Sequence, residues 1–209
     1  MSSSKRLTGG FAALLILSAA TACTSGGPAP SPAPGSSTVE ASPTNGPTAP
    51  ITARDGRTVL PTSESNACSL LSEAAIRDAL GSVAQTLQAP QPSADRLPDG
   101  TTQDFCLYPF ENGGPTTNAV LVEVRNYPTP QAAAGSDPFA LLMNAEDLPG
   151  LRQPAKYAVN SLSESTEFVA ASLEGSRVVR LVAALPPAKA WDRAAGREHM
   201  KKLATAAGL

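Results

Sequence analysis

The chain has 209 residues, with 16 basic and 18 acidic side chains, three cysteines and a single histidine. Its formal net charge of −2, without a concentrated run of Lys and Arg, argues against nucleic-acid binding, because that function needs clustered cations against phosphates. Proline and glycine number 20 and 16, which indicates that part of the chain has too little apolar surface to build a core.

Residues 1–22 have the pattern of a secretory signal peptide. Lys5 and Arg6 form a basic start, an apolar run follows over residues 11–17, and small residues lead to the junction. The apolar run is shorter than the roughly 20 residues that span a bilayer, and no later segment approaches that length. The sequence therefore predicts export without a membrane-spanning helix.

The junction Ala20-Thr21-Ala22-Cys23 resembles the lipobox of bacterial lipoproteins. In that class the cysteine thiol receives a diacylglyceryl group and the preceding peptide is removed. The resemblance implies a lipoprotein that begins at Cys23 on the extracytoplasmic face of the cell membrane, where palmitate-type acyl chains provide a stable anchor. The open alternative is an ordinary signal peptide cleaved after Ala22, with Cys23 as a free thiol.

Residues 23–64 are predicted to form a tether behind the lipid anchor. Pro, Gly, Ser, Thr and Ala dominate this segment, and such a composition cannot supply a hydrophobic core. The prolines favour extended backbone while the glycines loosen it, so we expect a semi-flexible linker. A single globular domain is predicted over residues 65–209.

The domain is predicted to begin with a helix and a hairpin. Ser72 is a suitable N-cap for a short helix over residues 73–80. Proline and glycine predict a loop over residues 89–102. The apolar runs 105–108 and 119–124 predict two strands that pair with one another.

A second helix is predicted after Asp137. This carboxylate stands before a proline, Pro138, at the first helical position, and Phe139, Leu142 and Met143 follow at helical spacing. The helix is expected to end before Pro149 and Gly150, and residues 150–163 are predicted to form a surface loop.

The last third of the chain carries the clearest pattern. Strands over 168–173 and 178–184 are predicted to form a hairpin, and a helix is predicted from 191 to 206. The apolar stripe expected on that helix consists of Ala195, His199, Leu203 and Ala206. Alternating helices and hairpins predict an α+β domain, with an antiparallel sheet and helices packed on one face.

The three cysteines predict one disulfide. Once Cys23 is lipidated, Cys68 and Cys106 are left as a pair in an oxidising compartment, where a disulfide is the default state. The bridge would tie the start of the first helix to the first strand. Zinc is the competing interpretation, but two cysteines and one histidine do not fill a tetrahedral site.

The same region carries a family resemblance. The segments concerned are Cys68-Ser69-Leu70-Leu71-Ser72, Ala79-Leu80-Gly81 and Cys106-Leu107-Tyr108. They resemble the C-x-L-L…L-G…C-x-aromatic pattern of a family of actinobacterial cell-envelope lipoproteins whose domain has no assigned function. That family more often has Trp at the position of Tyr108. The resemblance implies an exported α+β domain on a lipid anchor and supplies no catalytic residue.

Candidate chemistry in the sequence is sparse. The sequence has no G-x-S-x-G, H-E-x-x-H, P-loop or dinucleotide-binding motif. His199 lies on the apolar stripe of the last helix, which favours packing over catalysis. Two carboxylate pairs and one set of loop residues are weaker candidates for acid–base chemistry and anion binding. They are Glu146 with Asp147, Glu164 with Glu167, and Arg152, Lys156 and Tyr157.

These observations predict a non-enzymatic binding or interaction module for an envelope ligand or protein partner, without a cofactor or a bound metal. The alternative is a small envelope hydrolase that uses carboxylates or a lone serine. Two convergent carboxylates, or a serine and an acid beside His199, would favour the hydrolase. An apolar groove between sheet and helices would favour ligand binding.

We predict that Cys23→Ala abolishes lipidation, because the thiol is the acceptor atom. Detergent-phase partitioning of the protein measures this. The variant should remain an uncleaved precursor or be shed, and a mature-size variant in the detergent phase would contradict the lipobox interpretation.

Overall fold

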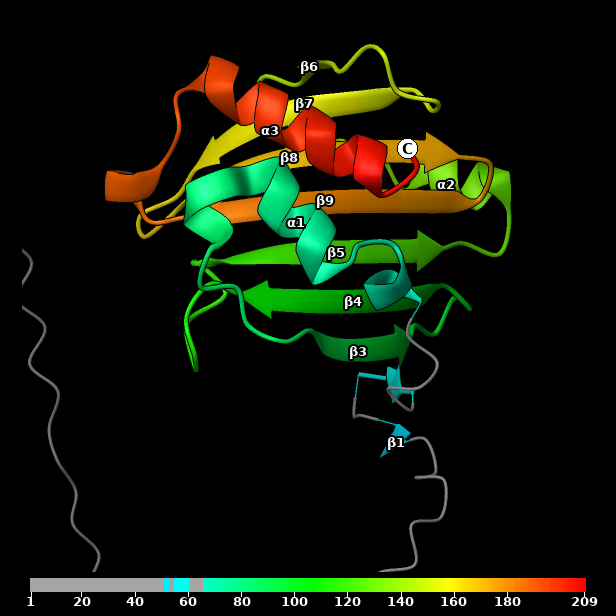
Figure 1. The fold of residues 1–209 in the computed structure, drawn as a ribbon. Helices are drawn as coiled ribbons and strands as arrows, with labels where there is room; N and C mark the ends of the chain where they lie inside the picture. The colour runs from blue at the N-terminus through cyan, green and yellow to red at the C-terminus, as the bar shows by residue number, and fades with distance from the viewer. Residues whose placement is uncertain (1–50, 53–54, 61–65) are drawn as a thin grey trace, which may run out of the picture. The chain divides into compact units, whose positions relative to one another are not determined.

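The computed structural model describes residues 51–52, 55–60 and 66–209 (Figure 1). These residues form a nine-stranded, entirely antiparallel sheet in the order β1-β2-β3-β4-β5-β9-β8-β7-β6. The predicted α+β class, with a sheet built from hairpins, is confirmed. The predicted signal peptide and Cys23 lie outside the described residues, as does most of the predicted tether.

The strands differ widely in length. Their bounds are β1 Ile51–Thr52, β2 Thr58–Val59, β3 Gln91–Arg96, β4 Thr102–Pro109, β5 Ala119–Asn126, β6 Glu146–Asp147, β7 Ala155–Ser161, β8 Thr166–Glu174 and β9 Arg177–Leu185. The α-helices are α1 Glu73–Leu80, α2 Pro130–Gly135 and α3 Arg193–Ala206, and short 3₁₀ turns cover Ala67–Ser69, Gly81–Ala84 and Pro187–Lys189.

Helices α1 and α3 lie together across one face of the sheet (Figure 1). The expected start of α1 is confirmed, because the Ser72 hydroxyl accepts a hydrogen bond from the Ala75 amide. The carboxylate of Asp192 caps α3 in the same way, at 2.8 Å from the Ala195 nitrogen. Helix α2 lies behind the sheet in the view of Figure 1.

Side chains alternate between the two faces of the sheet. The face under α1 and α3 carries the main core, in which the largest fully buried side chains are Tyr108, Tyr157, Phe168, Leu71, Ile76, Leu80, Leu181, Leu185, Met200 and Leu203. The opposite face, called the open face below, carries a smaller apolar cluster of Ala158, Val169, Ala171, Val182 and Leu142. The helix side of the sheet therefore buries many more apolar side chains than the open face does.

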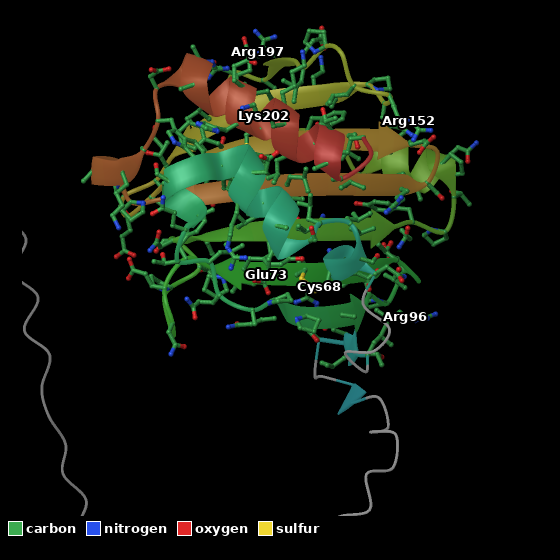
Figure 2. All side chains as sticks on the ribbon, in the orientation of Figure 1. Cys68, Glu73, Arg96, Arg152, Arg197 and Lys202 are labelled. Atoms are coloured by element: carbon green, nitrogen blue, oxygen red, sulfur yellow. A yellow bond between two sulfur atoms is a disulfide. The ribbon has the colours of Figure 1, made fainter. Side chains whose placement is uncertain are left out.

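The disulfide predicted between Cys68 and Cys106 is present in the structure, with the two Cα atoms 5.0 Å apart. It joins the turn before α1 to β4 on the helix side of the sheet (Figure 2). Closing a loop of 38 residues restricts the unfolded chain by about 4 kcal/mol in the entropy model. The Tyr108 hydroxyl donates a hydrogen bond to the Leu71 carbonyl, which holds the same connection.

The helix predicted after Asp137 is wrong. Asp137 has a φ of 45°, whereas a helix N-cap has an extended backbone. The helix instead forms earlier, as α2, where Thr129 is extended and its side chain accepts from the Ala132 amide. Residues 137–144 form turns that cross the open face, and Phe139 and Leu142 pack there on its apolar cluster.

Two predicted loops contain strands. The loop predicted over 89–102 contains β3, which includes Pro92. Among the described residues, β2 pairs with Asp95 and Arg96 and does not extend to Pro92. A strand tolerates proline where its nitrogen faces no partner strand. The loop predicted over 150–163 contains β7, whose alternating buried side chains follow the two-residue period of a strand.

The first two strands lie before residue 65, where the globular domain is predicted to begin. Strands β1 and β2 fall within residues 23–64, and β2 pairs with β3 through Thr58 and Val59. Such short strands carry no apolar pattern, so their pairing depends on the edge that β3 offers.

The buried stripe of α3 is rotated from the predicted one. It consists of Gly196, Met200, Leu203 and Ala204, whereas Ala206 is exposed. Gly196 sits where the helix meets the sheet, and a Cβ atom there would lie 2.8 Å from the Tyr157 hydroxyl and closer still to the Phe168 ring. The small residue permits this close approach.

We expect Gly196→Ala to destabilise the protein by about 1–3 kcal/mol, because the added methyl group overlaps two buried aromatic side chains. Gly135→Ala in α2 is the control, since a Cβ atom there meets nothing within 4 Å, and its effect should be neutral or slightly stabilising. Urea unfolding measures both. Equal stability of the two variants would contradict this packing.

Candidate functional site

A hollow of about 360 Å³ lies on the open face of the sheet. Its lining consists of Ser93, Phe105, Leu107, Thr116, Thr117, Ala119, Leu121, Glu167, Arg180, Val182 and Ala184. We call it the open-face hollow. Strands β3, β4, β5, β8 and β9 supply all of these residues except Thr116 and Thr117, which belong to the β4–β5 connection.

The floor of this hollow follows from strand register. Leu107 of β4 pairs with Leu121 of β5, and Leu121 pairs with Val182 of β9. The row continues through Val169 to Ala158, which are buried with Leu142. One apolar row thus crosses five strands. Residues 137–144 cover one end of it, while Leu107 and Leu121 at the other end stay partly exposed.

Charged residues lie on both sides of this apolar row. Glu123 pairs with Arg180 across β5 and β9. Only 3% of Glu123 is exposed, and its carboxylate forms ion pairs with Arg125 and, at 3.6 Å, with Arg180. A second carboxylate, that of Glu167, lies 3.8 Å from Arg180. We call Glu123, Arg125, Glu167 and Arg180 the open-face charge cluster.

The charge cluster connects to the covering segment. Asn160, which is 6% exposed, donates a hydrogen bond to Glu167 at 3.3 Å and accepts one from the Met143 amide at 3.1 Å. A smaller hollow of about 140 Å³ lies between the sheet and residues 136–142. Arg180 lines both hollows, so it stands at the point where they meet.

The charges in this cluster support one another. Burial lowers the pKa of the Arg125 guanidinium, but the Glu123 carboxylate and the Tyr127 hydroxyl together outweigh burial and raise that pKa. Arg125 therefore stays charged. The buried Glu123 carboxylate keeps two cationic partners, which is the arrangement that makes burial of a charge tolerable.

His199 lies on the helix side of the sheet, whereas the charge cluster lies on the open face. Its ring stacks on Trp191 with 4.3 Å between centroids, and Nδ1 lies 2.7 Å from the Ala79 carbonyl oxygen. These contacts tie α3 to α1 on the helix side of the sheet. They fit the packing role expected from the sequence.

The predicted carboxylate pairs do not converge. Glu146 lies 3.5 Å from Arg193 of α3, whereas Asp147 pairs with Lys156 at 2.7 Å. The labelled Arg197 shows where α3 meets this edge of the sheet (Figure 2). Of the other predicted pair, Glu164 is exposed and Glu167 belongs to the charge cluster.

The predicted anion-binding residues are also separated. Lys156 and Tyr157 are consecutive in β7 and therefore face opposite sides of the sheet. Tyr157 is fully buried and donates to the Arg193 carbonyl at 2.9 Å, and burial raises its pKa to about 12. Arg152 is exposed in the preceding loop.

The sequence analysis missed Glu123 and Arg180. Each is a charged residue within an apolar strand, in Val122-Glu123-Val124 and Val179-Arg180-Leu181. Opposite charges within two otherwise apolar predicted strands were the available signal, because a buried charge requires a partner. Without the β5–β9 register, that partner could not be identified.

Comparison with models of known protein families, with curated proteins and with solved structures finds no match to this chain. The family resemblance around Cys68 and Cys106 therefore stays a prediction. Within residues 51–52, 55–60 and 66–209, no helix is long and apolar enough to cross a membrane. The same described part of the chain contains no group of three or more potential metal-ligating His, Cys, Asp or Glu side chains.

We expect Glu123→Gln to destabilise the protein by about 2 kcal/mol, because it removes the charge that Arg125 and Arg180 share in a partly buried site. Glu73→Gln is the matched control, since Glu73 forms an exposed i,i+4 pair with Arg77 and should contribute less than about 1 kcal/mol. Thermal unfolding measures both. A smaller effect at Glu123 than at Glu73 would contradict the role given to this cluster.

Proposed function

We propose that this protein is a non-enzymatic binding module that takes up a small, largely apolar molecule in the open-face hollow. The observation that carries the proposal is a hollow of about 360 Å³ with an apolar floor and a charged end. Ligand sites are typically concave, mostly apolar and about 300–1,000 Å³ in volume.

The uneven cover of the open face supports this proposal. Leu107 and Leu121 belong to the same row as Val182, which is buried beside Leu142. Burying apolar surface stabilises a complex by about 25 cal/mol per Å². A molecule seated over Leu107 and Leu121 would extend the layer that residues 137–144 begin.

The surroundings of the hollow favour binding over hydrolysis. Glu167 lines it, Glu123 lines the smaller hollow beside it, and both carboxylates are paired with Arg180. His199 is engaged with Trp191 and Ala79 on the helix side of the sheet. A hydrolase of the kind considered from the sequence would need convergent carboxylates or a serine beside that histidine.

The proposal places the module outside the cytoplasm. A lipid anchor at Cys23 would hold the domain at the outer face of the cell membrane, where its ligand would be an envelope molecule. The Cys68–Cys106 disulfide supports such a setting, because disulfides persist in oxidising compartments.

Nile red, a neutral dye that fluoresces in apolar surroundings, tests the hollow directly. The protein should bind it, and Leu121→Gln should weaken binding about tenfold, because an amide would replace part of the apolar floor. Leu162→Gln is the control, since Leu162 is 50% exposed and lines neither hollow.

Circular dichroism of both variants ensures that folded proteins are compared. Binding that Leu121→Gln leaves unchanged, or that both variants weaken equally, would place the dye elsewhere and contradict the proposal.

A further inference from the structure

Arg180 is the feature of the hollow that bears on the chemistry of its ligand. Its side chain is 23% exposed and lines both the open-face hollow and the smaller one beside it. A charged group is thus presented at the end of an apolar floor. A ligand on that floor would meet the guanidinium.

The guanidinium has unused capacity to donate. It carries five N–H donors, and its two carboxylate neighbours lie at 3.6 and 3.8 Å, which is longer than a hydrogen bond. In the described part of the chain, no acceptor lies within hydrogen-bond distance of the Arg180 side chain. The two carboxylates, by contrast, accept hydrogen bonds from Arg125 and Asn160.

The unused N–H donors of Arg180 favour one sign of charge on the ligand group that meets them. An anionic group could accept two parallel hydrogen bonds from the guanidinium, as carboxylates and phosphates do. A cationic group would meet Arg180 there, and the one carboxylate that lines the open-face hollow, Glu167, already accepts a hydrogen bond from Asn160. Acceptors are therefore favoured at this end of the hollow.

We infer, on the basis of the proposed function, that the ligand is an anionic amphiphile with one apolar chain. Its carboxylate or phosphate binds Arg180, and its chain lies over Leu121 and Leu107. Carboxylate and phosphate heads share this chemistry, and the structure favours neither.

Displacement of Nile red at neutral pH tests the inference with three probes: decanoate, decyl phosphate and decanol. The full protein should bind at least one of the two acids about tenfold or more tightly than decanol. Decanoate and decyl phosphate both have ten carbons but differ by one methylene in the alkyl chain, so a difference in affinity larger than the roughly fourfold effect of one methylene identifies the preferred anion.

Arg180→Met should remove the preference for an acid over decanol, because the guanidinium that would bind the anion is gone. Arg180→Lys keeps the positive charge but lacks the planar guanidinium that donates two parallel hydrogen bonds, so it should retain part of the preference. It is also the variant to test if Arg180→Met fails to fold. Arg152→Met is the matched control, because Arg152 is exposed and lines neither hollow, and it should retain the full preference.

The outcomes separate the two proposals. Equal affinity for the acids and decanol, or equal loss of preference in the Arg152 and Arg180 variants, would overturn the anionic ligand and leave the apolar hollow intact. Failure of all three probes to displace bound Nile red would count against the proposed function itself.

Discussion

The antiparallel pairing of β5 with β9 is the constraint on which the rest of this structure depends. It joins two meanders, β1 to β5 and β6 to β9, that are otherwise built from strands neighbouring in sequence. Its register sets Val122 beside Leu181 on the helix side and Glu123 beside Arg180 on the other. A shift by one residue would exchange the two faces, placing charges in the main core.

The two faces of the sheet are covered to different extents, because the connections between strands place different elements on them. The helix side receives α1 and α3, the Cys68–Cys106 bridge and the stacked pair of Trp191 and His199. In the described part of the chain, the open face receives the short helix α2 and the turns over residues 137–144, whose Leu142 packs on its apolar cluster. One face of the sheet is covered by the main core, and the other leaves part of its apolar surface exposed. This arrangement suits a binding site, because ligand contacts can form on the exposed face without disturbing the core.

The sequence predicted those elements whose signals are local. Ser72 is a recognisable N-cap for α1, and β4, β5, β8 and β9 each contain a continuous apolar run. The expected oxidising compartment predicted the disulfide between the two remaining cysteines. It failed where tertiary context decides. Asp137 and Pro138 imitate a helix start, yet the chain turns there through a left-handed backbone, and β3 forms through Pro92 only because it lies near an edge. The charge cluster could not be foreseen, because its members meet across a register that no local pattern encodes.

Methyl NMR of the protein during titration with decanoate tests the central claim most directly, namely that the open face is the binding face. The account predicts shifts confined to methyl groups around the open-face hollow, led by Leu107 and Leu121, while those of Met200 and Leu203 in the main core stay in place. Shifts concentrated under the helices, or no shift at Leu107 and Leu121 at saturating decanoate, would contradict it.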